Sequence, residues 1–208
     1  MADTVIDFIR HGEPVGGRCY RGNGVDDPLS ETGWVQMWSA LGDSCPWDEV
    51  ISSPLQRCHA FARELGERHK RPVHIDDRFR EVGFGSWEGR TPEQILASNA
   101  DEYHAFHEDP LHQRPDGAEP LEAFGKRVAE GLNHLSTHYA GKHLLVVAHA
   151  GVIRAALGHV LKADPAAWYR TRIDNAGLTR FRYGAQGVRL EFHNRVGLPE
   201  AGITSDDG

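Results

Sequence analysis

Residues that can handle a phosphoryl group follow three short apolar segments of this chain. Residues 5–9 run into Arg10-His11-Gly12-Glu13, residues 49–51 run into a polar stretch that ends at Arg57, and residues 144–148 run into His149. A neutral imidazole is a competent nucleophile toward phosphorus, and guanidinium groups offset the charge on phosphoryl oxygens. Two histidines and two arginines brought to one place would therefore form a site that transfers a phosphoryl group to a histidine.

The predicted strands and helices around these residues would place them close together. Apolar segments alternate with helical segments at both ends of the chain, which is typical of βαβ units and a mostly parallel sheet. Ligands bind an open α/β sheet beyond the carboxyl ends of its parallel strands. Each pattern alone is weak evidence, because a four-residue match arises by chance and a histidine after an apolar strand is often a core residue. Their conjunction predicts one site at one edge of the sheet.

Capping signals place three helices. Ser30 is expected to cap a helix that reaches about Leu41, and Thr91 with Gln94 forms a capping box. Ser53 followed by Pro54 predicts the start of another helix, which extends to about His69. Arg57 would then lie near the first turn of that helix, where the positive end of the helix dipole adds to its charge.

The rest of the chain divides into a few further elements. Residues 91–117 are polar, rich in histidine and helical in pieces, and they are too short for a core of their own. We therefore expect one domain over residues 1–201 with a lid-like helical insertion at 91–117. Apolar spacing predicts helices over 120–139 and 152–161, followed by a hairpin of strands near 178–183 and 188–193.

Two segments are expected to lack regular structure. The glycine-rich stretch 16–24 is predicted to be a long mobile loop. Residues 202–208 are small and acidic and are expected to form a disordered tail.

Composition argues against several classes of partner. A net charge of −7 disfavours sequence-independent binding to nucleic acid, which requires a basic surface. No apolar run approaches the ~20 residues that a membrane-spanning helix needs, and the residues after Met1 do not resemble a secretory signal. Three widely spaced cysteines without a Cys-x-x-Cys pair favour a reduced, cytoplasmic protein. Among thirteen histidines, His104 and His107 are the best local pair for a metal, but they lack a third ligand, so we predict no metal site.

Four motifs together resemble the signatures of the histidine phosphatase (phosphoglycerate mutase-like) superfamily. They are Arg10-His11-Gly12-Glu13, Ser53-Pro54-Leu55-Gln56-Arg57, Glu81-Val82-Gly83-Phe84-Gly85-Ser86-Trp87-Glu88-Gly89 and Val147-Ala148-His149-Ala150-Gly151. The resemblance extends from about residue 5 to residue 192. It implies an α/β fold, a three-layer α/β/α sandwich with a mostly parallel central sheet and a helical insertion over the active site. It also implies a small phosphomonoester substrate and no metal or cofactor.

The resemblance assigns a role to each site residue. By it, His11 is the phospho-accepting nucleophile, while Arg10, Arg57 and His149 form the phosphate pocket. Glu81 would protonate the leaving group. Arginines favour the ionised carboxylate, so we expect repulsion from the bound dianionic phosphate to offset them, and Glu81 to take up its proton when the substrate binds. The alternative is a structural glutamate that orients an arginine.

The substrate is predicted from chain length and from looser similarities. A short chain favours a phosphatase over a mutase, which carries extra loops that retain its phosphorylated product. Residues 83–88, 101–106 and 168–174 look most like those of alpha-ribazole-5'-phosphate phosphatases of cobalamin lower-ligand assembly. Two alternatives stay open. One is a sugar-phosphate enzyme of the fructose-bisphosphatase or phosphoglycerate mutase type, and the other is an inactive binding or scaffold protein with the same fold.

The loop after His11 departs from the family pattern. Pro14 and Val15 stand where many relatives carry Thr or Ser followed by a phosphate-binding Asn. Arg21 or Arg18 could replace that contact, or both could simply be exposed in the loop.

Aromatic residues form a second group of candidate substrate contacts. Tyr20 and Trp87 could stack on a planar group of the substrate, with core packing as the alternative. The sequence does not report the oligomeric state, so a homodimer stays open.

Overall fold

Apolar strands form a six-stranded sheet in the order β3-β2-β4-β1-β5-β6. The computed structural model describes residues 2–199 of the chain. The strands β1 (Thr4–Arg10), β2 (Glu49–Ser52), β3 (Val73–Ile75) and β4 (His143–Ala148) are mutually parallel, whereas β5 (Leu178–Gly184) pairs antiparallel with β1. β6 (Gly187–Arg195) completes the predicted hairpin with β5. The central sheet is therefore mostly parallel, as predicted.

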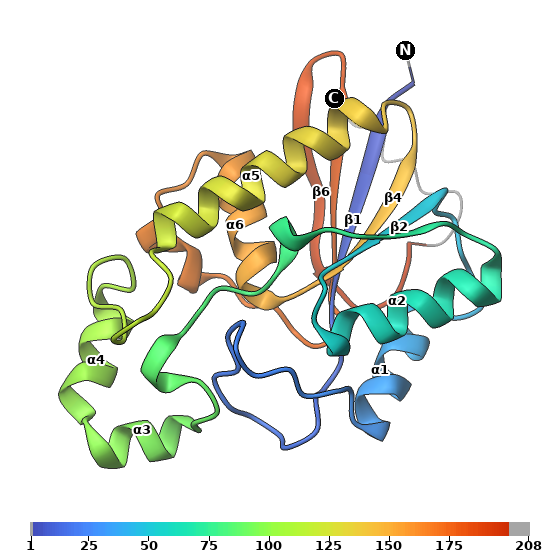
Figure 1. The fold of residues 1–208 in the computed structure, drawn as a ribbon. Helices are drawn as coiled ribbons and strands as arrows, with labels where there is room; N and C mark the ends of the chain where they lie inside the picture. The colour runs from blue at the N-terminus through green and yellow to red at the C-terminus, as the bar shows by residue number, and fades with distance from the viewer. Residues whose placement is uncertain (1, 200–208) are drawn as a thin grey trace.

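Side-chain alternation along the strands gives the sheet two apolar faces. Leu144 and Val146 of β4 belong to one core cluster, whereas Leu145 and Val147 belong to the other. The first cluster packs beneath α5 (Leu121–His138) and α6 (Ala150–Leu161), and the second beneath α1 (Glu31–Leu41) and α2 (Gln56–His69). Figure 1 shows these two helix pairs on opposite sides of the sheet. The predicted α/β/α class is thus confirmed.

The insertion and the turns supply short helices. The predicted helical pieces within 91–117 are α3 (Pro92–Ser98) and α4 (Ala100–Glu108), and they lie beyond one end of the sheet (Figure 1). Three 3₁₀ turns span Asp77–Phe79, Gly85–Trp87 and Pro165–Arg170. The tail predicted at 202–208 lies outside the described residues.

Two of the three predicted helix starts are confirmed. The Ser30 side chain accepts a hydrogen bond from the Gly33 N–H, and Thr91 forms the expected capping box with Gln94. The third start is wrong, because α2 begins at Gln56 rather than beside Pro54. Ser53 Oγ instead lies 2.7 Å from His149 Nε2.

Asp26 takes over the missing capping interaction. Its carboxylate accepts the Gln56 N–H at 2.7 Å from a different part of the chain. Arg57 is therefore the second residue of α2.

Candidate active site

A cavity of about 570 Å³ contains most of the predicted site residues. Its walls come from the end of β1, the loop that follows, α2, the segment before the insertion, the insertion itself, α6 and the segment before β5. The lining residues are Arg10, His11, Glu13, Pro14, Gly17, Arg18, Cys19, Tyr20, Arg21, Gly22, Arg57, Glu81, Phe84, Pro92, Phe106, His107, Ala150, Arg154, Tyr169 and Asn175.

Strand register brings the two histidines together. β1 and β4 are parallel neighbours with Arg10 opposite Ala148, so the residues that follow each strand lie side by side. The His11 N–H donates to the Ala148 carbonyl at 2.9 Å, and the rings of His11 and His149 have centroids 5.2 Å apart. His149 lies buried behind the cavity wall, whereas His11 reaches the cavity.

The His11 ring is oriented as a nucleophile requires. Its Nδ1 lies 2.7 Å from the Gly12 carbonyl oxygen, which can only accept, so Nδ1 carries the proton. The lone pair of Nε2 is then free. Burial first, and then the charges of Arg10 and Arg57, lower the pKa of His11 well below its ordinary value. His11 is therefore neutral at physiological pH.

His149 is held neutral for similar reasons. Burial, with the nearby Arg57 charge, lowers the pKa of His149 well below its ordinary value. Ser53 Oγ accepts the Leu55 N–H at 3.3 Å, so its own hydroxyl proton can point at His149 Nε2.

These two pKa shifts predict acid-sensitive folding. The unfolded chain protonates both histidines below about pH 6.5, whereas the folded chain does not, so the unfolded state binds more protons there. The free energy of unfolding should fall as pH drops from 6.5 to 5, by up to about 1.4 kcal/mol per pH unit for each histidine. Urea unfolding measures this free energy at each pH. Between about pH 5 and 6.5 it should change less steeply with pH in His149→Asn than in the parent. An unchanged slope would contradict the neutral state of His149.

Main-chain carbonyls orient the arginines of the cavity. Arg10 Nη1 donates to the Ile173 oxygen at 2.6 Å, and Arg57 donates to the Gly22 and Val25 oxygens at 2.9 Å each. Within residues 2–199 neither guanidinium forms an ion pair with a carboxylate. Burial lowers the pKa of Arg10 to about 10, which leaves it charged at neutral pH. Carbonyls fix the position of these cations without neutralising them, so both are available to an anion.

The glycine-rich loop packs against the site. Tyr20 forms an isolated bridge with Arg90, and Gly22 is buried beneath the Arg57 guanidinium. Arg21 is only 8% exposed and is anchored by the Asp27 carboxylate at 2.8 Å and the Val15 carbonyl at 2.7 Å. Its charge contributes to the lowered pKa of His11, after burial and the charges of Arg10 and Arg57. Arg21 is thus a fixed cation at the cavity, whereas Arg18 lines the same cavity from an exposed position.

The two predicted aromatic contacts differ. Tyr20 lines the cavity, with its ring 5.0 Å from that of Phe84 and 5.1 Å from that of Trp87. Trp87 is fully buried, is stacked on Tyr103 and packs edge-on against Phe106. Trp87 is therefore a core residue behind Tyr20, and it cannot make the predicted substrate contact.

Glu81 faces the cavity from the segment before the insertion. Its carboxylate accepts the Val82 N–H at 3.0 Å and the Gly151 N–H at 3.3 Å. A Cβ on Gly151 would lie 2.3 Å from Glu81 Oε1, so glycine is what allows this approach. Within the described chain Glu81 forms no ion pair with an arginine, which disfavours the alternative of an arginine-orienting glutamate.

Several residues that line the cavity were not predicted from the sequence, and Arg154 is the one that adds a positive charge. It lies one helical turn beyond Ala150 on α6, and both residues line the cavity. Its Nε and Nη2 both donate to the Thr171 oxygen at 3.2 Å, and within residues 2–199 it has no carboxylate partner. The i,i+4 spacing from a residue at the strand end was the signal that could have found it.

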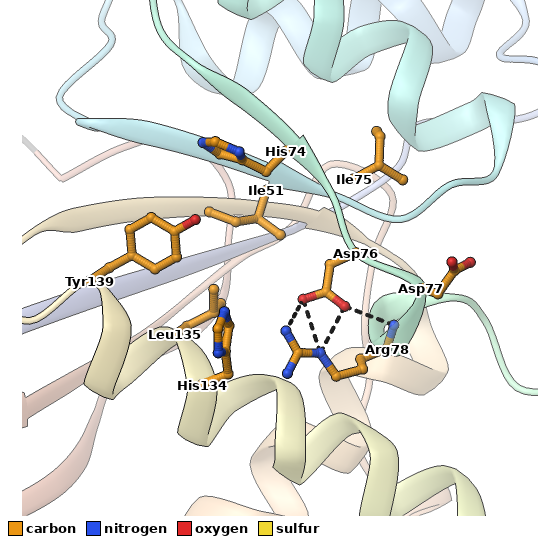
Figure 2. Close-up of a pocket in the computed structure, with 9 residues that line it drawn as sticks. All are labelled: Ile51, His74, Ile75, Asp76, Asp77, Arg78, His134, Leu135 and Tyr139. Carbon is orange, nitrogen blue, oxygen red and sulfur yellow. Dashed lines mark hydrogen bonds and ion pairs between the residues drawn. The ribbon is translucent and has the colours of Figure 1, made fainter.

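A second cavity of about 300 Å³ lies beside the edge strand β3 and the end of α5 (Figure 2). Its charged groups pair within the protein. Arg78 donates to both oxygens of Asp76, and His74 Nε2 lies 2.7 Å from a Glu49 carboxylate oxygen. These pairs leave their charges compensated, in contrast to Arg10 and Arg57.

The described chain holds neither a metal-binding cluster nor a membrane span. Within residues 2–199 no group of three or more histidine, cysteine, aspartate or glutamate side chains could hold a metal ion. No helix in the same range is long and apolar enough to cross a membrane.

Sequence comparison places the chain in a family. Residues 6–196 match the model of the histidine phosphatase superfamily (branch 1), and the chain belongs to that superfamily. It is 30% identical over 172 residues to the adenosylcobalamin/alpha-ribazole phosphatase of Salmonella typhimurium, covering 80% of this chain and 84% of that protein. It is also 31% identical over 194 residues to a bifunctional protein of Mycobacterium tuberculosis. That match covers 90% of this chain but 53% of the relative, so the chain spans about half the length of this protein.

Solved structures show the same fold. The alpha-ribazole phosphatase of Shigella flexneri superposes with a TM-score of 0.80 at 27% identity, covering 94% of this chain and 98% of that one. A mycobacterial glucosyl-3-phosphoglycerate phosphatase gives a TM-score of 0.80 at 28% identity, with coverage of 92% and 99%. The neighbours thus share phosphatase names but differ in the substrates that those names carry.

Proposed function

We propose that this chain is a metal-independent phosphomonoesterase that acts through a phosphohistidine on His11. The observation that carries the proposal is a neutral imidazole whose Nε2 has no hydrogen-bond partner within residues 2–199, beside Arg10 and Arg57, which form no ion pair in the same range. Membership of the histidine phosphatase superfamily supports it.

The proposed reaction has two steps. His11 Nε2 attacks phosphorus, the bond to the ester oxygen breaks, and Glu81 gives that oxygen its proton. Water then attacks the phosphohistidine while the Glu81 carboxylate accepts a proton from it, and orthophosphate leaves with His11 restored.

The remaining pocket residues stabilise charge in this scheme. Arg10 and Arg57 line the cavity and bind the phosphoryl oxygens, while His149, buried beside His11, completes the pocket from behind. Arg21, which an ion pair with Asp27 holds at the cavity, takes the place of the asparagine of many relatives. Arg18 is the more exposed candidate for the same contact.

Trapping the intermediate tests the proposal. Brief reaction with a phosphate-labelled ester, followed by quenching, should leave label on His11 that is stable in base and released in acid. Label on a serine, or none at all during turnover, would overturn the phosphohistidine route.

Alpha-ribazole 5'-phosphate is the proposed substrate. The cavity is far larger than a phosphoryl group, and the half-buried rings of Tyr20 and Tyr169 line it as aromatic surfaces for a planar base. The names of the Salmonella typhimurium and Shigella flexneri proteins support this choice. The cytoplasmic location and the homodimer stay predictions.

Arg154 favours a second candidate, a phosphate ester that also carries a carboxylate. Its uncompensated charge in the cavity could bind such a group, and the mycobacterial neighbour is named for a phosphoglycerate ester. Ranking kcat/KM for alpha-ribazole 5'-phosphate, glucosyl-3-phosphoglycerate and phosphoserine decides between the two candidates. Phosphate exchange between phosphoglycerates would instead identify a mutase.

Arg154→Gln should separate these substrates. If a carboxylate binds Arg154, the variant should lose about 10- to 100-fold in kcat/KM on the carboxylated ester, which corresponds to losing one charge-assisted hydrogen bond. Its kcat/KM on p-nitrophenyl phosphate should change less than about threefold. Equal losses on both substrates would place Arg154 in the phosphate pocket itself.

A further inference from the structure

Arg57 holds both ends of a short loop. Its Nη2 donates to the Gly22 oxygen and its Nη1 to the Val25 oxygen, each at 2.9 Å. We refer to residues 22–25 as the 22–25 loop. Because the two bonds come from one planar guanidinium, the spacing of the two carbonyls fixes the plane and direction of Arg57.

Glu88 binds the middle of the same loop through its main-chain N–H groups. Its Oε1 accepts the Asn23 N–H at 3.2 Å, and its Oε2 accepts the Gly24 N–H at 3.0 Å. Oε1 also accepts the Phe84 N–H at 2.9 Å, which ties the loop to the segment beneath the insertion. Three bonds to an ionised acceptor are charge-assisted and therefore stronger than neutral ones.

The glycines of the loop fit the Glu88 carboxylate closely. A Cβ on Gly22 would lie 1.9 Å from Oε1, and a Cβ on Gly24 would lie 2.1 Å from Oε2. Gly22 also has a φ of +55°, a conformation that other residues rarely adopt. Backbone shape and carboxylate position are thus matched to each other.

We propose that Glu88 is a positioning residue for phosphoryl transfer and that it acts through the 22–25 loop on Arg57. The proposal rests on the phosphate-binding role of Arg57 given above. Glu88 bonds N–H groups rather than the guanidinium, so it directs Arg57 without neutralising its charge. A carboxylate paired directly with Arg57 would compete with the substrate phosphate.

A purely structural Glu88 is the competing explanation, in which the bond to the Phe84 N–H only stabilises the turn at Gly85–Trp87. The two explanations differ in whether the effect of Glu88 depends on Arg57. A double-mutant cycle measures that dependence.

The cycle combines Glu88→Gln with Arg57→Lys, and the readout is kcat/KM for p-nitrophenyl phosphate together with inhibition by orthophosphate. Lysine keeps the positive charge but cannot hold both loop carbonyls. We expect Glu88→Gln to lower kcat/KM at least about tenfold, and to weaken orthophosphate inhibition, when Arg57 is present. In the Arg57→Lys background, the same change should cost less than about twofold.

Glu119→Gln is the matched control. Its carboxylate also accepts a main-chain N–H of the same segment, that of Gly83 at 3.1 Å, but within residues 2–199 it forms no hydrogen bond with the 22–25 loop. Glu119→Gln should change kcat/KM by the same factor in the parent and in the Arg57→Lys background. If thermal unfolding shows that Glu88→Gln does not fold, Glu88→Asp, which keeps the charge on a shorter side chain, replaces it in the same cycle.

The outcomes separate the inference from the function on which it rests. Equal factors for Glu88→Gln in both backgrounds would overturn the positioning role while leaving the phosphatase proposal intact. An Arg57→Lys variant as active as the parent would contradict the phosphate-binding role of Arg57, and with it this inference.

Discussion

Replacing His11 by alanine should lower kcat/KM for phosphate esters by about 10,000-fold or more, because it removes the only atom proposed to bond to phosphorus. Water cannot use the same site efficiently, since the residues around His11 are placed for an attacking Nε2 and not for a bound water. The phosphoryl label on the protein should disappear together with turnover. Rates with p-nitrophenyl phosphate and quench-labelling of the same preparations measure both effects.

Binding should survive this substitution. Arg10 and Arg57 are held by the carbonyls of Ile173, Gly22 and Val25, none of which depends on the His11 side chain. Orthophosphate should therefore still protect His11→Ala against thermal unfolding.

His107→Ala is the matched control for this substitution. His107 lines the same cavity from α4, and its Nδ1 donates to the Tyr103 oxygen at 2.9 Å. It should keep activity within about tenfold. Near-parental hydrolysis by His11→Ala would refute the nucleophile assignment.

The meeting of the two histidines could be predicted because it depends on strand register. An apolar strand followed at once by a histidine occurs twice, and parallel pairing of β1 with β4 places the residues after both strands at one edge. Local pattern and parallel topology are enough for that conclusion. The same reasoning found the capped helix α1 and the buried stripe of α5, where spacing alone decides which residues face the core.

Predictions failed where a side chain is used by a distant part of the chain. Ser53 has the sequence context of a helix cap, yet its hydroxyl is hydrogen-bonded to His149 Nε2. Asp26 instead accepts the first N–H of α2. Trp87 has the type of a stacking residue, yet Tyr103 and Phe106 enclose it. Such contacts join residues far apart in the sequence, so no local pattern reports them.

The three-residue strand β3 was missed for a different reason. It lies at the edge of the sheet, where Val73 is half-buried and both His74 and Ile75 are exposed. Val73-His74-Ile75 alternates apolar and polar residues, but three residues are too few to distinguish a strand from a loop. Only the pairing with β2 reveals it.

Glu81→Gln should affect esters according to how much their leaving group needs a proton. An alkoxide is a poor leaving group, so loss of the general acid should lower kcat/KM for an alkyl phosphate by about 100- to 10,000-fold. p-Nitrophenolate leaves without protonation, and its ester should lose less than about tenfold. Glutamine keeps the shape of the side chain, but its one amide oxygen can accept only one of the Val82 and Gly151 N–H groups, which Glu81 accepts through separate oxygens. Any resulting shift of the side chain should lower kcat/KM for both esters by a similar factor. The ratio of the two losses therefore measures the loss of proton donation to the leaving group, separately from any displacement of the side chain.

Glu13→Gln is the matched control for that ratio. Glu13 also lines the cavity, but its carboxylate lies 3.3 Å from the Ser30 hydroxyl, at the start of α1. Its substitution should change both esters by the same factor, because a carboxylate bound there delivers no proton. If Glu81→Gln likewise lowers both esters equally, Glu81 is not the acid. The Gly151 N–H bond would then be the reason for its position, and the proton would have to reach the leaving oxygen from water that enters the cavity.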